Sequence, residues 1–236
     1  MSRLNNVNNK GEIKMNSIQK TARIAGFLYL LQIPLGVFGL VYVPKALIVS
    51  GNATETARNI LANEFLFRLS IVSAILAALV AVFTAIFLYK VLKPVNKNVA
   101  KLMVIFTVII APISMLNELN NVAVLLLLKS PSQLQTLVPL FLDLHKYGIQ
   151  IVGIFFGLWL LPMGYLVIKS GYMPKIIGFF LLITCLGYLI DFFTFFLFPN
   201  FGVIISQYTF LGEVMMVFWL LIKGVNVKEW EKRAQK

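Results

Sequence analysis

Long apolar runs, separated by short polar segments, set the pattern of this chain. Six runs are present: residues 24–43, 65–88, 102–128, 148–168, 176–197 and 201–222. Each has about 20 residues or more, the length that an α-helix needs to cross a hydrocarbon layer about 30 Å thick. The runs are apolar on all sides, whereas the strands of a membrane barrel alternate apolar and polar positions. The pattern therefore predicts an all-α integral membrane bundle of six transmembrane helices.

Two polar interruptions leave details of the helices open. The third run contains the sequence NELNN at residues 117–121 before a last apolar stretch, so its helix ends either near Asn121 or at Leu128. Residues 54–61 resemble a capped helix start that leads into the second span. Residues 139–144 either lie at the membrane interface or extend the fourth helix outward.

Glycine and proline positions predict how the spans pack and bend. Gly153 and Gly157 form a G-x-x-x-G pattern, and Gly164 continues the same face one heptad later. Such small residues let another backbone approach closely, either within this chain or across a dimer interface, and we favour packing within the chain. Pro34 and Pro162 lie inside apolar runs, where proline removes a backbone hydrogen bond and favours a kink.

Composition agrees with this class of protein. The chain has 236 residues, of which 59% are hydrophobic and 13% charged, whereas soluble domains have about 45–50% and about 25%. These fractions exclude a soluble enzyme, a disordered chain and a disulfide scaffold. Cys185 is the single cysteine, so no disulfide forms within the chain.

Basic residues predict the orientation of the bundle in the membrane. One face carries sixteen, namely Arg3, Lys10, Lys14, Lys20, Arg23, Lys90, Lys93, Lys97, Lys101, Lys169, Lys175, Lys223, Lys228, Lys232, Arg233 and Lys236. The other face carries five, namely Lys45, Arg58, Arg68, Lys129 and Lys146. Because cytoplasmic loops are enriched in Lys and Arg, both termini are expected in the cytoplasm. The net charge of +12 then reports topology, so the expected partners are membrane lipids with anionic headgroups at the cytoplasmic face, and no nucleic acid.

The chain divides into three predicted parts. Residues 1–20 form a polar cytoplasmic extension, residues 21–225 the six-helix transmembrane domain, and residues 226–236 a basic cytoplasmic tail. The first apolar run has the full length of a span and no preceding signal-peptide pattern, so we interpret it as an uncleaved first helix. The predicted location is the cytoplasmic membrane, as a multi-pass protein.

Ionisable residues inside the spans are the candidates for function, because each costs about 2.5–3.5 kcal/mol near a helix centre. Counting along the helices places Glu213 near the midplane and Asp191 and Glu118 in the outer half. Arg68 and His145 fall close to the outer boundary. We predict an outward-opening polar cavity with Glu213 at its floor. The alternative is that these groups serve as polar contacts between helices.

Enzyme chemistry has little support in the sequence. His145 is the single histidine, and no zinc-protease pair, nucleophile elbow, P-loop or dinucleotide fingerprint is present. We therefore predict no cofactor and no metal. A metal site built from His145, Glu118, Asp191 and Glu213 is a weaker alternative.

Several stretches together resemble one family. They are residues 25–30, residues 59–68 (NILANEFLFR), residues 88–96 (LYKVLKPVN), the long stretch 155–191, and residues 212–225 (GEVMMVFWLLIKGV). This combination is similar to the bacterial membrane family with the domain of unknown function 4386. Met15 resembles the usual start of that family, so residues 1–14 would be an extension.

The resemblance implies a single polytopic domain in a bacterial cytoplasmic membrane and supplies no activity. The family-like stretches contain Glu64, Arg68, Asp191 and Glu213, which favours these residues over the asparagine cluster as functional candidates.

Three functions stay open at this point. We favour a bundle that binds or passes a small amphiphile or ion, with Arg68, Glu118, Asp191 and Glu213 as a charged lining. The second is an intramembrane enzyme that acts on a lipid. The third is a membrane scaffold or accessory subunit, in which the chain forms a homo-oligomer or joins a partner membrane subunit.

Overall fold

The computed structural model describes residues 2–131, 135–198 and 200–235, which are mostly helical and contain no strand. In chain order the elements are α1 (Ser2–Val37), the π-helix η1 (Phe38–Tyr42), α2 (Val43–Leu47), α3 (Ala53–Ala62), α4 (Glu64–Leu92), α5 (Lys97–Leu128), α7 (Val138–Leu158), α8 (Leu160–Ser170), α9 (Lys175–Leu197), α10 (Ser206–Thr209), α11 (Leu211–Ile222) and α12 (Val227–Ala234). This arrangement confirms the predicted all-α fold class.

Five helical segments in the described part of the chain are long and apolar enough to cross a membrane. They are Ser17–Leu47, Glu64–Leu92, Lys97–Leu128, Val138–Ser170 and Lys175–Leu197. A sixth is present if Ser206–Ile222 and Val227–Ala234, which meet at a bend of 100°, are counted as one span. The chain is therefore a multi-pass membrane protein with five to six spans.

The last apolar run is only partly helical. Residues 201–204 have no helical structure, and helix starts at Ser206. The segment Ser206–Ile222 is about 25 Å long at 1.5 Å per residue, shorter than the hydrocarbon layer. A left-handed backbone at Gly202, with φ of +66°, precedes its start. The run thus starts as a non-helical segment, which its apolar composition does not reveal.

The other details left open by the pattern are resolved by the helix bounds. α5 continues through the polar sequence to Leu128, and α7 begins at Val138, so residues 139–144 are part of the fourth helix. Residue Asn52 caps α3 by accepting a hydrogen bond from the Glu55 N–H. A break at Trp159 separates α7 from α8, three residues before Pro162, whose ring cannot donate to the preceding turn.

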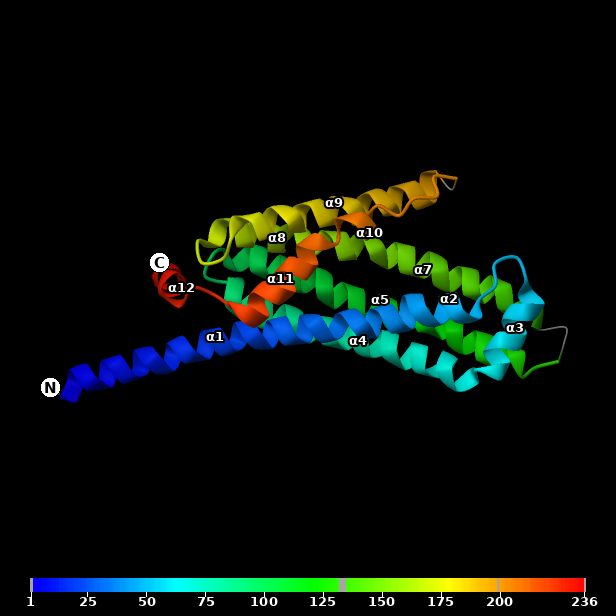
Figure 1. The fold of residues 1–236 in the computed structure, drawn as a ribbon, viewed down its shortest axis with the longest axis horizontal. Coiled ribbons are helices and arrows are strands. Elements are labelled where there is room, and N and C mark those ends of the chain that lie inside the picture. The colour runs from blue at the N-terminus through cyan, green and yellow to red at the C-terminus, as the bar shows by residue number, and fades with distance from the viewer. Residues whose placement is uncertain (1, 132–134, 199, 236) are drawn as a thin grey trace.

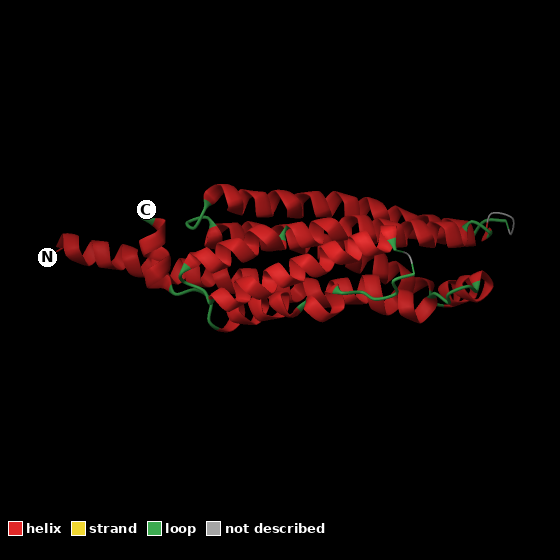
Figure 2. Ribbon diagram, turned by 90° about the horizontal axis from the view of Figure 1, so that it is seen from above, coloured by secondary structure: helices red, strands yellow, loops and turns green. Residues whose placement is uncertain are grey.

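Successive helices pack side by side into a bundle (Figures 1 and 2). α1 packs on α4 and α11, α4 on α5, α5 on α7, and both α7 and α8 on α9, which also contacts α11. Both chain ends lie at one end of the bundle, and the first turns of α1 project beyond it (Figure 1). We call this the terminal end, and the end that carries α2 and α3 the distal end.

Two hydrogen bonds to one carbonyl group fasten the terminal end. The carbonyl oxygen of Val91, in the last turn of α4, accepts from the Tyr172 hydroxyl and from the Trp230 indole N–H, both at 2.8 Å. Burial raises the pKa of the Tyr172 hydroxyl well above its usual value, so this group stays a donor. α12 and the connection between α8 and α9 are thereby held against α4.

A second fastening joins the first helix to the end of the chain. The Gln19 side chain donates to the Lys223 carbonyl at 2.7 Å and accepts from the Val225 N–H at 3.1 Å. Gly224 lies between these two residues with φ of +67°, a backbone conformation that favours glycine. The turn from α11 into α12 is therefore fixed by α1.

The glycines of α7 and α8 differ in what they approach. Gly157 lies 3.1 Å, measured from an added Cβ, from the Cys185 carbonyl of α9, and Gly164 lies 2.9 Å from the Gly178 carbonyl. Nothing lies within 4 Å of that position at Gly153. Close backbone packing within the chain thus involves Gly157 and Gly164, while Gly153 is in open space.

This difference predicts opposite responses to alanine. Gly164→Ala is expected to lower the midpoint of thermal unfolding of the detergent-purified protein, because its methyl group would crowd the Gly178 carbonyl oxygen at a cost of about 1–3 kcal/mol. Gly153→Ala is the matched control, since it makes the same change in a helix with nothing to crowd. Equal midpoints for the two variants would contradict the packing of α8 on α9.

Candidate functional site

The most deeply buried ionisable pair joins α5 to α7. Nε2 of His145 lies 2.8 Å from Oε1 of Glu118, within hydrogen-bond distance. Their residues are only 6% and 4% exposed. Both side chains are thus removed from solvent. Burying an ionisable group in a membrane protein costs free energy unless it has a hydrogen-bonding partner, and here each side chain is the partner of the other.

Three asparagines of α5 complete the surroundings of this pair. Asn121 donates from Nδ2 to Oε2 of Glu118 at 2.8 Å, and Asn117 donates to the His145 carbonyl at 2.9 Å. Asn120 donates to Oδ1 of Asn117 at 3.0 Å. The approach is possible because α7 has Gly148 opposite Asn117, where any side chain would collide with the amide. The polar sequence of the third run is therefore the α5 half of one site.

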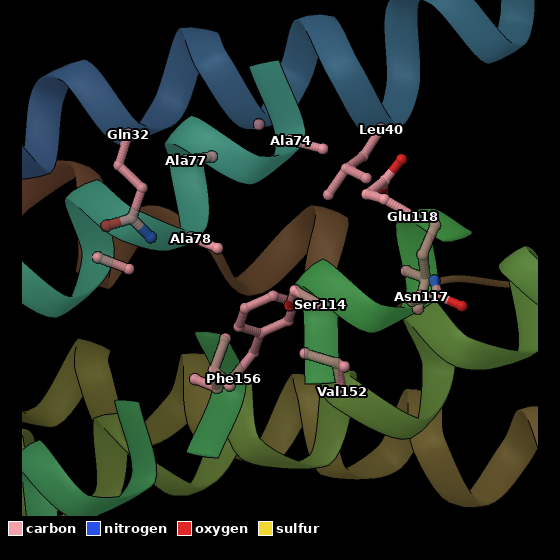
Figure 3. A pocket seen from close by; sticks show the side chains of 14 residues that line it. Gln32, Leu40, Ala74, Ala77, Ala78, Ser114, Asn117, Glu118, Val152 and Phe156 are labelled. Carbon is pink, nitrogen blue, oxygen red and sulfur yellow. The ribbon is translucent and has the colours of Figure 1, made fainter. Parts of the chain in front are cut away.

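A small cavity lies next to Glu118, which forms part of its lining (Figure 3). Its volume is about 100 Å³, enough for a few water molecules. It is lined by Gln32, Gly36, Leu40, Ala74, Ala77, Ala78, Ala81, Ile110, Ser114, Asn117, Glu118, Ile149, Val152 and Phe156. We call it the inner cavity.

Four alanines on one face of α4 create this space. Ala74, Ala77, Ala78 and Ala81 follow the i, i+3, i+4, i+7 spacing of a single helical face, so a strip of small side chains faces α5 and α7. The polar members of the lining are Gln32, Ser114, Asn117 and Glu118. Figure 3 shows Gln32 and Glu118 on opposite sides of the view. Oε1 of Gln32 is buried and has no hydrogen-bond partner among the described residues.

A larger cavity opens at the distal end. It has a volume of about 800 Å³ and is lined by the connection between α2 and α3 together with faces of α4, α5 and α7. Asn121 and His145 contribute to its wall, and Lys45, Asp143 and Lys146 bring charge to it. We call it the vestibule.

The Glu118–His145 pair separates the two cavities. His145 lines the vestibule, Glu118 lines the inner cavity, and Leu40 and Ile149 line both. A molecule that passes from the vestibule to the inner cavity would therefore meet the hydrogen-bonded pair. In chemical terms the carboxylate oxygens of Glu118 can accept hydrogen bonds from such a molecule.

Glu213 lies in a different polar cluster. Its carboxylate accepts hydrogen bonds from the hydroxyls of Tyr29 at 2.5 Å and Tyr188 at 3.2 Å, so it links α11 to α1 and α9. It is absent from the linings of the inner cavity and the vestibule. Glu213 was predicted to form the floor of a polar cavity, but of these two carboxylates only Glu118 lines one, the inner cavity.

Asp191 and Arg68 have local partners of their own. The Asp191 carboxylate accepts from the backbone N–H groups of Ile205 at 2.5 Å and Ser206 at 2.9 Å, and so caps the start of α10. Arg68 pairs with Glu64 at 2.7 Å near the distal end, with its side chain 52% exposed. Of the five predicted site residues, the structure brings only Glu118 and His145 together.

The described residues contain no group of three or more His, Cys, Asp and Glu side chains that could hold a metal ion. The four residues of the alternative metal site are divided between the Glu118–His145 pair, the cap at Asp191 and the tyrosine cluster at Glu213. Carboxylates at a similar depth in a bundle need not share a site, because the direction of each side chain depends on the rotation of its helix about its own axis.

Sequence reasoning missed Tyr29 and the alanine strip. Tyr29 is fully buried in the first span, and its hydroxyl needs an acceptor there, which the depth of Glu213 could have suggested. The alanines carry a clear signal, since their spacing marks one face of the helix that contains them. Small residues on such a face indicate close packing or a space, and only the structure separates the two.

The model of the domain of unknown function DUF4386 matches residues 24–224. The chain belongs to the DUF4386 family. This DUF4386 chain is also similar to an uncharacterized protein from Archaeoglobus fulgidus, with 36% identity over 179 residues that cover 72% of the chain and 96% of the relative. No solved structure matches it.

The family match confirms the resemblance seen in the sequence and leaves the activity open, since the family has no assigned function. The matched region contains the Glu118–His145 pair, the inner cavity and the Glu213 cluster. The site is thus part of the family domain, and its role has to be argued from its geometry.

The Glu213 cluster predicts a graded effect on stability. Glu213→Leu leaves the hydroxyls of Tyr29 and Tyr188 without their acceptor, at about 1–3 kcal/mol for each buried unsatisfied group. Glu213→Gln keeps an amide oxygen as acceptor. We expect the midpoint of thermal unfolding in detergent to fall in the order parent, Gln variant, Leu variant. A Leu variant as stable as the parent would show that the cluster is not a structural joint.

Proposed function

We propose that this protein binds a small amphiphile that enters from the vestibule, places its polar head at the Glu118–His145 pair and its apolar part in the inner cavity. The observation that carries the proposal is the position of the pair between the two cavities. A head group that donates hydrogen bonds or carries positive charge suits this place, because Glu118 presents carboxylate oxygens there. A short amine is the simplest molecule with this chemistry.

The dimensions of the inner cavity support a small ligand. About 100 Å³ is less than the roughly 150 Å³ cavity that admits benzene, so the apolar part is limited to a few carbon atoms. Gln32 offers an unpaired amide oxygen at this site. A ligand with a second donor would satisfy that oxygen and gain a hydrogen bond that the empty site lacks.

The distribution of basic residues supports an orientation for the site. Lys93, Lys97 and Lys101 surround the turn between α4 and α5, and this turn lies at the terminal end with both chain ends (Figure 1). By the enrichment of Lys and Arg in cytoplasmic loops, the terminal end faces the cytoplasm and the vestibule opens outward. The ligand would then arrive from outside a cytoplasmic membrane.

Binding is favoured over the two other functions by specific contacts. An intramembrane enzyme would be supported by a second carboxylate beside the pair, yet among the described residues Glu118 is the carboxylate that His145 contacts. A scaffold requires packing alone, whereas the alanine strip leaves space next to a buried ionisable pair.

A series of short amines tests the proposal. The detergent-purified parent should gain thermal stability in butylamine beyond the gain in butanol, since a ligand that binds the folded state stabilises it. Ammonium, without an apolar part, and hexylamine, too long for the inner cavity, should give smaller gains.

Two variants make this test specific. Glu118→Gln keeps a hydrogen-bonding side chain beside His145 and Asn121 but removes the negative charge, so the advantage of butylamine over butanol should disappear. Glu64→Gln removes an equal charge from the exposed pair at Arg68 and should respond like the parent. The proposal is wrong if the parent and Glu118→Gln show the same advantage.

Filling the inner cavity gives an independent prediction. Ala78→Leu adds three carbon atoms on the wall opposite Glu118, into space that the parent leaves empty, so we expect a folded protein that has lost its response to butylamine. The check is the same thermal measurement, with helicity by circular dichroism as the control for folding. A retained response in a folded Ala78→Leu variant would place the ligand elsewhere.

A further inference from the structure

A groove at the terminal end has the composition of a lipid site. It lies between α1 and α11, has a volume of about 470 Å³, and is lined by Gln19, Lys20, Arg23, Ile24, Phe27 and Leu221. None of these residues lines the inner cavity or the vestibule. The groove is therefore separate from the candidate site and independent of the function proposed for it.

The lining is ordered along α1 from charged to apolar. Lys20, Arg23, Ile24 and Phe27 follow the i, i+3, i+4, i+7 spacing of one helical face. From Lys20 to Phe27 the helix rises about 10 Å, and this direction runs from the terminal end into the apolar span. The basic groups thus lie at the depth of headgroups and the apolar groups at the depth of acyl chains.

The two basic side chains are available to a ligand. Lys20 and Arg23 are exposed, and no acidic side chain in the described part of the chain forms an ion pair with either. Phe27 below them is 58% exposed. An aromatic ring in this position presents its apolar surface to whatever lies in the membrane beside α1.

The wall of the groove is held in place by polar contacts. Gln19 is bonded to the backbone at Lys223 and Val225, so α1 and the end of α11 keep a fixed separation there. The site is built by two elements and does not depend on a mobile loop. A preformed groove lowers the cost of ordering that binding would otherwise carry.

We propose that this groove binds one anionic glycerophospholipid, whose phosphate contacts Lys20 and Arg23 and whose acyl chain lies along Ile24, Phe27 and Leu221. Charge complementarity supports this occupant, because two unpaired cations stand above an apolar surface inside a span. A soluble anion would use the charges and leave the apolar half of the groove uncovered. A lipid covers both halves, and it is present wherever the chain is folded in a membrane.

Native mass spectrometry of the full-length protein in detergent tests the proposal. The protein is mixed with phosphatidylglycerol or phosphatidylcholine of the same acyl chains, and retained lipid is counted. The parent should retain one phosphatidylglycerol in preference to phosphatidylcholine. In the variant with Lys20→Gln and Arg23→Gln this preference should fall by roughly tenfold.

A matched double variant separates a site from general surface charge. Lys97→Gln with Lys101→Gln removes the same charge from exposed positions at the terminal end of α5, outside the groove, and should keep the preference of the parent. An equal loss in both double variants, or a parent that retains the two lipids equally, would overturn the proposal.

A competition experiment decides between a lipid and a free anion. Glycerol phosphate at millimolar concentration should not displace the retained phosphatidylglycerol, because it has no acyl chain for the apolar half. Phe27→Ala should weaken lipid retention, and as an exposed position it should leave the unfolding midpoint unchanged. Displacement by glycerol phosphate together with full retention in Phe27→Ala would show an anion site instead of a lipid site.

Discussion

A polar side chain inside a membrane span has no water to bind, and in this protein the partners that replace water determine how the helices cross. Glu118 is satisfied by His145 and Asn121, which requires α5 and α7 to meet at Gly148. Glu213 is satisfied by two tyrosines, which requires α11 to lie between α1 and α9. The apolar contacts fill the space around these joints, and the close backbone approaches at Gly157 and Gly164 add to them where α7 and α8 meet α9.

The candidate site departs from this pairing of polar groups at the inner cavity. Around the inner cavity the small side chains of the alanine strip leave a space beside α4, and Gln32 has an amide oxygen without a partner in the described structure. The Trp219 indole N–H of α11 is the other buried side-chain group without a partner among the described residues, and it lies outside this lining. A space that is retained beside a buried carboxylate and histidine distinguishes this site from the two polar joints at Glu213 and Asp191.

The fold was predictable from the sequence because long apolar runs have few structural solutions in lipid. Ionisable residues within or near the apolar runs are equally visible in the sequence. Glu118, His145, Asp191 and Glu213 could therefore be selected in advance. Their grouping could not, because it depends on the rotation of each helix about its axis. Asp191 illustrates this, since its carboxylate turns toward the start of α10 fourteen residues later and away from the cavities. The non-helical start of the last run could not be predicted, because an apolar composition does not distinguish helix from coil over so few residues.

The contact between Gln19 and residues 223–225 bears on the order in which the protein is made. Gln19 lies in α1, and the backbone groups that it binds follow it by 204 and 206 residues. During synthesis α1 is made before these partners, so its earlier neighbours are α4 and Trp159, whose ring centroid lies 5.4 Å from that of Tyr29. The contact between α1 and α11 forms only after residues 211–222 are made, and a chain that stops before residue 211 would leave Gly26 of α1 without Leu220 and Leu221, which pack against it.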